Sequence, residues 1–186
     1  MPKPTVCSQG GFTLVEVLVA AAIVATGTSV LAALFILAIE VNRTARAATF
    51  ATVLAQQKME QLRGLTWGYD VLGGPASDLT TDISVVPFTA AGPGLSPSPP
   101  DTLLRNTAGY VDFVDGAGNW IGTGTSVPGG AVYVRRWAID PLPSSPNSTL
   151  ILQVLVTRRA SRGGADRKSA GRLPEEARLI GARTRK

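Results

Sequence analysis

The feature that most constrains this chain of 186 residues is an apolar segment near its N-terminus. Residues 17–39, which are 23 consecutive positions, carry no charge. As an α-helix, a segment of this length spans about 34 Å, which is enough to cross the hydrocarbon core of a bilayer. Hydrophobic residues make up 45% of the chain, a high value for a soluble protein, and they are concentrated in this segment. The sequence therefore predicts one membrane helix.

Two other classes of protein have an apolar segment in this place. A secretory signal peptide has an apolar core of roughly 7 to 15 residues, so the segment here is too long, although Ala45-Arg46-Ala47 imitates a signal-peptidase site. A lipoprotein needs its cysteine after the apolar stretch, whereas Cys7 comes before it. The secretory alternative stays open, and the lipoprotein is excluded.

The net charge of +5 is concentrated at one end of the chain. Residues 158–186 carry ten Lys or Arg against three acidic residues, a net +7, so the residues before them sum to −2. Because residues 158–186 are also rich in Gly, Ser and Ala, we predict that they form a basic, disordered tail. Solvation of this tail, or its attachment to an anionic membrane or an acidic partner, explains the charge, and no nucleic acid is expected as a partner.

Enzyme chemistry is constrained by residue types that the sequence lacks. It contains no histidine, which removes the commonest general base, the Ser-His-Asp arrangement and the usual metal ligand. Cys7 is the only cysteine, so an intramolecular disulfide and a multi-cysteine zinc site are excluded. No nucleophile motif and no Gly-rich phosphate loop occurs. We therefore expect no catalytic residues, no cofactor and no metal.

A carboxylate directly precedes the apolar segment. Glu16 directly precedes the uncharged run, and an unpaired charge costs about 3 kcal/mol at the centre of a membrane. If the chain is cut between Gly11 and Phe12, the new amine of Phe12 lies four residues before Glu16, which is one helical turn. A helix N-terminus also stabilises a nearby carboxylate through its dipole. The alternative is a carboxylate that lies at the level of the lipid headgroups without a partner.

The run Gly11-Phe12-Thr13-Leu14-Val15-Glu16 resembles the cleavage and methylation motif of type IV prepilins. In that family a short polar leader ends in Gly, the first mature residue is usually Phe, and the fifth is Glu. The resemblance implies that a prepilin peptidase cuts after Gly11 and methylates the amine of Phe12. It also implies that Glu16 pairs with an amine during assembly with other pilin or pseudopilin subunits on an inner-membrane assembly platform.

The leader, residues 1–11, is less basic than the leaders it resembles, because Lys3 is its only charged side chain. Arg43 and Arg46 lie beyond the apolar segment, so the positive-inside rule gives little support to either orientation. The motif itself implies a single-pass protein of the inner membrane, with a cytoplasmic N-terminus and a periplasmic head, that later enters a pilus or pseudopilus.

The helical pattern continues past the membrane segment. No Pro or Gly occurs between Thr28 and Arg63, so we predict one helix over residues 12–63, with 12–39 as its transmembrane part and 40–63 as an amphipathic continuation. A coiled-coil stalk would need a longer heptad run, and the continuation is therefore expected to pack on the C-terminal domain. Its predicted buried stripe consists of Val41, Ala45, Ala48, Thr52, Ala55, Met59 and Leu62, with Lys58 on the polar side.

Residues 64–157 are predicted to form the exported head. Strand signals occur over residues 110–114, 131–139 and 150–157, with 82–88 as a weaker fourth, and Pro- and Gly-rich loops join them. The expected fold class is therefore α+β and pilin-like, with one long N-terminal helix packed on a small antiparallel sheet. The residues expected to face the helix are Val132, Val134 and Trp137.

The last two predicted strands resemble the final hairpin of PilV-class minor pilins and of the I-type minor pseudopilin of type II secretion. Residues 54–63 resemble the end of the long helix in the same proteins. The resemblance implies a structural minor pilin or pseudopilin. The alternative is a membrane-tethered periplasmic enzyme or binding protein with a non-cleaved signal anchor, which the missing catalytic motifs disfavour.

A cluster of oxygen-bearing side chains follows the first strong strand signal. Asp112, Asp115 and Asn119 lie close together in sequence, as the ligands of a calcium loop do. Their spacing is not that of an EF-hand, and Asp115-Gly116 is typical of a turn between two strands. We therefore predict a turn here, with calcium binding as the alternative.

Overall fold

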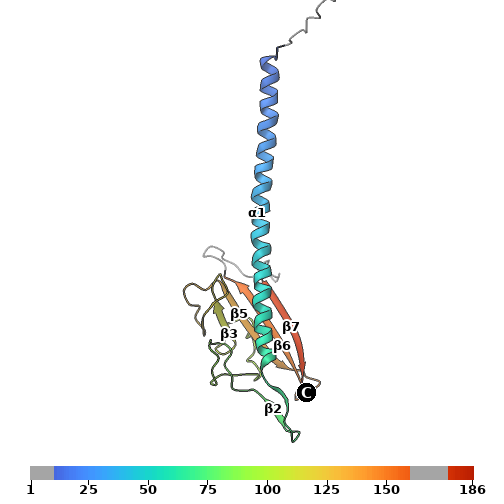
Figure 1. Cartoon of the computed structure of the whole chain (residues 1–186), viewed down its shortest axis with the longest axis vertical. Coiled ribbons are helices and arrows are strands. Elements are labelled where there is room, and N and C mark those ends of the chain that lie inside the picture. Colours follow the sequence, from blue (N-terminus) through green and yellow to red (C-terminus); the bar gives the residue numbers. More distant parts are fainter. Residues whose placement is uncertain (1–10, 160–175) are drawn as a thin grey trace, which may run out of the picture. The chain divides into compact units, whose positions relative to one another are not determined.

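The structure is a computed structural model that describes residues 11–159 and 176–186. The chain divides into two compact units, Met1–Arg43 and Thr44–Lys186. One long helix, α1 (Leu14–Gly64), passes from the first unit into the second, and the strands of the described residues belong to the second unit (Figure 1). The fold class is α+β and pilin-like, as predicted.

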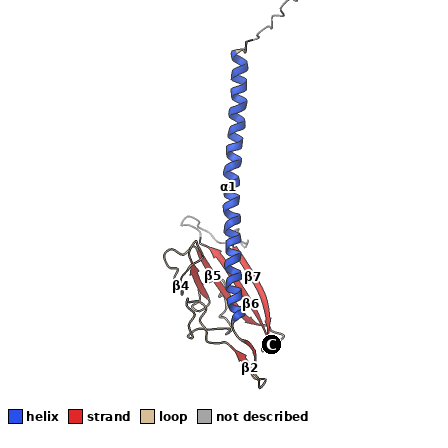
Figure 2. Cartoon of the chain, viewed as in Figure 1, coloured by secondary structure: helices blue, strands red, loops and turns tan. Residues whose placement is uncertain are grey.

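Helix α1 is unbroken over its whole length (Figure 2). It contains no Pro, and Gly27 is its only glycine before the terminal Gly64. Ala, Leu, Gln and Glu, which are good helix formers, supply much of the rest. The prediction of one continuous helix is confirmed, and its observed ends lie within two residues of the predicted ones.

The second unit contains two antiparallel sheets. The five-stranded sheet has the order β4-β3-β5-β6-β7, and the two-stranded sheet is a hairpin of β1 and β2. The strands are β1 (Trp67–Tyr69), β2 (Pro75–Ser77), β3 (Val111–Val114), β4 (Trp120–Thr123), β5 (Tyr133–Pro141), β6 (Thr149–Arg158) and β7 (Glu176–Thr184). Three of the predicted strands correspond to β3, β5 and β6. Residues 82–88 form no strand and contribute only an isolated bridge between Asp82 and Thr89.

The continuation of α1 packs on the sheet through a face that only partly matches the predicted stripe. Ala55, Met59 and Leu62 are buried as predicted, whereas Val41 and Ala45 are exposed. The residues buried on the helix are Ala47, Ala51, Leu54, Ala55, Lys58, Met59 and Leu62. The buried face includes a lysine that the sequence pattern assigned to the polar side, because this lysine has a buried acidic partner.

The main core lies between α1 and one face of the five-stranded sheet. Trp137 is fully buried in it and Val132 packs against it, as predicted. Val134 instead lies in a second cluster with Val111 and Phe113, so its prediction is wrong. Residues 134 and 137 of β5 point to opposite faces, because side chains alternate along a strand. Loop residues bury the second face too, so an apolar residue does not by itself mark the side of the helix.

The prediction of a disordered tail over residues 158–186 is wrong for the part that the structure describes. β7 pairs with β6 over nine residue pairs, and β6 itself extends to Arg158. Residues 160–175 lie outside the described residues. β7 belongs to the fold because Ala177 is buried and Leu179 packs against the main core. Arg183 lies on the same side of the strand as these two residues, whereas Arg178 lies on the other side. The count of positive charges gave no sign of this apolar contact.

β7 also supplies hydrogen-bond donors to the C-terminal end of α1. The Arg183 guanidinium donates hydrogen bonds to the backbone carbonyls of Leu62 (2.9 Å) and Leu65. The last carbonyls of a helix have no partner within the helix, so a cation in this position satisfies them and complements the helix dipole. Burial lowers the pKa of Arg183 from its usual range, but an arginine stays charged. The last strand thus stabilises an element more than a hundred residues away in sequence.

A buried ion cluster joins α1 to the sheet. Asp112 of β3 accepts hydrogen bonds from Arg135 of β5 at 2.6 and 2.8 Å, and its carboxylate lies 2.8 Å from the Lys58 ammonium. Lys58 also donates to the Ile83 carbonyl at 2.8 Å and lies over the Trp137 ring. The side chains of all three charged residues are at most 5% exposed. Each charge is therefore stabilised by its buried partners and not by water.

The titration of Lys58 gives a measurable pH dependence. Burial lowers the pKa of Lys58 to about 8 from 10.5, against the opposing effect of Asp112. The folded protein then binds fewer protons than the unfolded chain between these two pH values, so the free energy of unfolding due to this group rises with pH across that window. We expect the wild-type protein to gain up to about 3 kcal/mol relative to Lys58→Met between pH 8 and 10.5. Urea titrations of both proteins test this, and equal pH profiles would contradict it.

Candidate processing and assembly site

The start of α1 is defined by a threonine cap. Residues 11–13 are not helical, and the Glu16 backbone N–H donates to the Thr13 hydroxyl at 3.3 Å. A Thr followed three residues later by a Glu is the capping-box pattern, in which the side chains satisfy backbone N–H groups at the helix start. Sequence reasoning missed this role of Thr13, although the spacing of Thr13 and Glu16 was the signal. The cap fixes where the helix begins and leaves Gly11 and Phe12 outside it.

The bond between Gly11 and Phe12 lies in this non-helical stretch. Phe12 is 82% exposed, and a methyl group placed on Gly11 would meet no other atom within 4 Å. A protease needs a reachable, non-helical backbone at the bond that it cuts, and Gly11 and Phe12 are both exposed and outside the helix. The two residues that the sequence predicted to flank the cut are therefore next to each other, accessible and outside the helix.

Glu16 lies in the first turn of α1, where the helix dipole favours a negative charge. Its side chain is exposed, as are those of all residues from 11 to 43. An amine created at Phe12 would lie four residues before this carboxylate in the sequence. Glu16 can therefore serve the helix cap and an amine partner from the same position.

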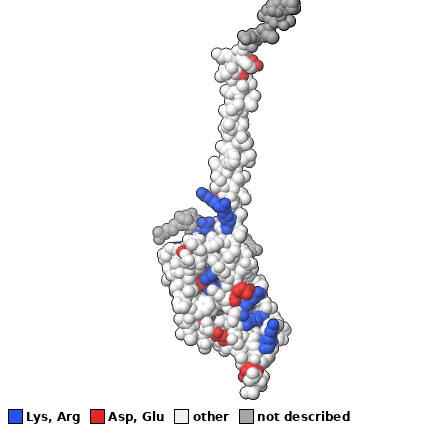
Figure 3. Space-filling model, in the orientation of Figure 1, with Lys and Arg blue, Asp and Glu red and all other residues white. Residues whose placement is uncertain are grey.

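Between Glu16 and Glu40 the helix exposes many large apolar side chains, and the face visible in Figure 3 carries no charge over this stretch. An 18-residue window of α1 is apolar enough to cross a membrane by length and composition, and none of it is buried. The polar side chains of this segment find hydrogen-bond partners within the helix. The hydroxyls of Thr26, Thr28 and Ser29 donate to backbone carbonyls three or four residues earlier. Such a surface is stable only against lipid or other apolar helices.

The oxygen-bearing side chains of Asp112, Asp115 and Asn119 hold the structure of the head together. Asp112 is fully buried and committed to Lys58 and Arg135, so it is not available to a metal ion. Asp115 accepts hydrogen bonds from Ala117 and Asn119 in the turn between β3 and β4, and its hydrogen bond to the Asn119 side chain lowers its pKa. The turn is confirmed. Within the described residues, no three acidic or cysteine side chains gather to hold a metal.

Comparison with known families bears on the N-terminal segment. Residues 7–32 match the prokaryotic N-terminal methylation motif. The match covers Gly11, Phe12 and Glu16 and the apolar segment as far as residue 32. This chain has a type IV prepilin-like N-terminus. Prepilin-like proteins of this kind are pilins and pseudopilins, which are structural rather than catalytic.

The match and the exposed apolar helix together indicate a membrane-anchored, single-pass protein whose N-terminus is of the type that prepilin peptidases process. No similar curated protein and no similar solved structure was found. The head of this prepilin-like protein is therefore interpreted from its own contacts.

Proposed function

We propose that this protein is a minor pilin or pseudopilin subunit that is cut after Gly11, methylated on the amine of Phe12, and assembled into a type IV pilus or a type II secretion pseudopilus. One observation carries the proposal. An exposed, non-helical Gly11–Phe12 bond lies four residues before Glu16, which stands in the first turn of a helix and is followed by 23 residues without charge.

The chemistry of assembly follows from these positions. Before the cut, residues 1–11 hold the N-terminus in the cytoplasm, residues 12–39 lie in the inner membrane, and the head is periplasmic. After the cut, the Phe12 amine and the Glu16 carboxylate neutralise each other within one chain or between neighbours. An unpaired charge is costly in an apolar fibre core, so this pairing sets the register of neighbouring helices. The apolar helix then exchanges its contacts with lipid for contacts with neighbouring helices, which costs little free energy.

The two assemblies use the same processing chemistry and the same partners, namely a prepilin peptidase, other pilin or pseudopilin subunits, and an inner-membrane assembly platform. The resemblance of the last hairpin and of residues 54–63 supports a PilV-class or I-type subunit. The alternative, a tethered periplasmic enzyme or binding protein, has no cluster of reactive side chains in the described residues to support it.

Substitution at the cut tests the proposal. Gly11→Leu places a branched side chain next to the scissile bond, where the structure shows only backbone, and we expect processing to be abolished. Gly10→Leu adds the same bulk one residue further away and serves as the matched control. The masses of both variants, isolated from membranes of cells that express a prepilin peptidase, are the readout. Equal processing of the two variants would contradict a cut at Gly11.

A further inference from the structure

The β1–β2 hairpin, residues 67–77, is a sheet of its own. Its two strands pair with each other through three residue pairs, and neither pairs with a strand of the five-stranded sheet. Its turn is also closed internally, because the Asp70 carboxylate accepts hydrogen bonds from the backbone N–H groups of Leu72 at 2.9 Å and Gly74 at 2.7 Å. The hairpin therefore keeps its internal hydrogen bonds whether or not it lies against the rest of the unit.

Arg185 and Lys186, here called the strap, join this hairpin to the five-stranded sheet. The Arg185 guanidinium carbon lies 3.7 Å from the centre of the Trp67 ring, and the guanidinium donates to the Gly68 carbonyl at 3.1 Å. Its Nε donates to the carbonyl of Asn147, in the loop between β5 and β6, at 3.0 Å. One side chain thus connects the hairpin with that loop.

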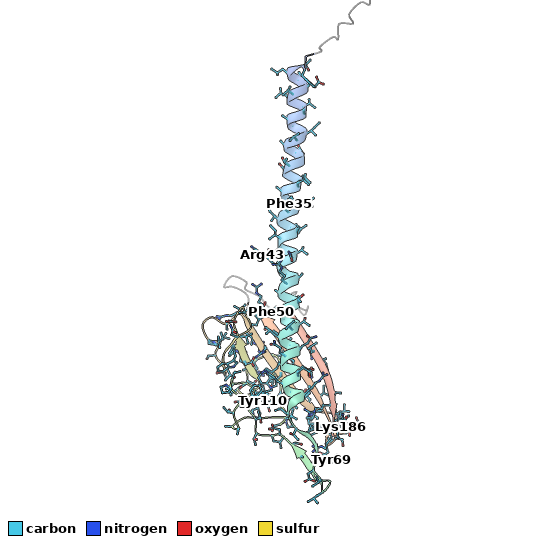
Figure 4. All side chains as sticks on the ribbon, in the orientation of Figure 1. Phe35, Arg43, Phe50, Tyr69, Tyr110 and Lys186 are labelled. Atoms are coloured by element: carbon cyan, nitrogen blue, oxygen red, sulfur yellow. The ribbon has the colours of Figure 1, made fainter. Side chains whose placement is uncertain are left out.

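The backbone of the strap makes the same connection. The Arg185 N–H donates to the Ser148 carbonyl at 2.7 Å, and the Lys186 carbonyl accepts from the Tyr69 N–H at 2.9 Å, so Tyr69 and Lys186 lie together in Figure 4. A Cβ on Gly68 would lie 2.9 Å from the Lys186 carbonyl oxygen, closer than Cβ atoms approach other atoms in proteins. Among the described residues, every hydrogen bond between residues 67–77 and the rest of the unit comes from the strap.

The closed position of the hairpin carries a cost at Trp67. The ring packs against the main core, and its indole N–H is buried without a hydrogen-bond acceptor among the described residues. A buried N–H without an acceptor has lost the hydrogen bonds that water gives it, and opening of the hairpin restores them. The apolar contacts of the ring and the contacts of Arg185 oppose opening. The closed hairpin therefore depends on the strap.

We propose that the hairpin opens as a unit while the five-stranded sheet stays folded, and that the strap holds it closed. Elements with few contacts to a folded core open locally, at a lower free energy than that of global unfolding. Opening withdraws Trp67 from the main core and separates Tyr69 from the strap. This inference goes beyond the proposed function, because it concerns the head alone and holds whether or not the protein enters a fibre.

Amide hydrogen exchange of the full-length protein in detergent micelles tests the proposal. Arg185→Ala removes the stacked guanidinium, so we expect the amides of residues 67–77 to exchange at least about tenfold faster while those of β5 and β6 keep their rates. Lys186→Ala is the matched control, because it changes the neighbouring side chain and keeps the carbonyl that Tyr69 contacts. We expect this control to exchange at the wild-type rate.

Gly68→Ala disturbs the strap from the side of the hairpin. Its methyl group would displace the Lys186 carbonyl, whereas the methyl group of Gly129→Ala meets no atom within 4 Å. We expect faster exchange over residues 67–77 in the first variant and wild-type exchange in the second. Wild-type exchange of the hairpin in both Arg185→Ala and Gly68→Ala would show that the strap does not hold it. Equal acceleration in β5 and β6 would show that the hairpin does not open by itself. Either result overturns the proposal.

Discussion

An Asp112→Asn variant is expected to lose about 3 to 5 kcal/mol of unfolding free energy. The substitution keeps the shape of the side chain but removes the negative charge that both Lys58 and Arg135 contact. The two cations then stay buried without a counter-charge, which is the costly way to break a buried ion pair. Domains are stable by only about 5 to 15 kcal/mol, so this loss removes a large part of the stability of the head. Urea denaturation followed by tryptophan fluorescence measures it.

Two further variants show whether burial of the charge is the cause. Asp101→Asn breaks an exposed ion pair with Arg105 and is expected to cost at most about 1 kcal/mol. Replacing the whole cluster, with Lys58→Met, Asp112→Leu and Arg135→Leu together, is expected to recover most of the stability lost in Asp112→Asn, because no charge is left buried. If Asp112→Asn loses no more unfolding free energy than Asp101→Asn, the buried ion pairs do not stabilise the packing of α1 on the sheet.

A Glu16→Ala variant is expected to be cleaved normally and to enter fibres at least about thirtyfold less than the wild-type protein. Loss of one partner of a desolvated charge pair costs about 2 to 5 kcal/mol, and the lower value corresponds to this factor. Cleavage is expected to continue because Gly11 and Phe12 stay exposed and outside the helix. The measurement is the amount of the variant in sheared fibres relative to the amount in membranes.

Glu16→Gln separates the two roles of this residue. Glutamine preserves the capping-box pattern with Thr13 but cannot neutralise an amine. We expect it to fail in assembly as Glu16→Ala does, whereas Glu40→Ala, which removes the other carboxylate of the first unit, is expected to assemble. Normal assembly of Glu16→Gln would reduce Glu16 to a helix cap and remove the electrostatic mechanism.

Features that depend on local sequence were predicted well. The long helix follows from the absence of Pro and Gly after residue 28, and its start lies within two residues of the predicted one. The strands β5 and β6 are long and rich in β-branched residues, so their positions were recognisable. None of these features needs a partner that is distant in sequence.

Features that depend on distant partners were not predicted. Lys58 is a polar residue by sequence, and only the arrival of Asp112 and Arg135 from two strands makes its burial favourable. β7 is basic by sequence, yet Arg183 is held by carbonyls at the end of α1. In both cases the buried charge is stabilised by a group that is distant in sequence: Asp112 lies 54 residues from Lys58, and the Leu62 carbonyl lies 121 residues from Arg183. Charge counts along a sequence cannot show such compensation.

The measurement that tests the central claim most directly is the identity of the N-terminal residue in the assembled protein. Mass spectrometry of the N-terminal peptide, taken from sheared fibres or from membranes, should find Phe12 as the first residue with one methyl group on its amine. A chain that still begins at Met1, or one cut near Ala47, would contradict the account, because no amine would then lie four residues before Glu16.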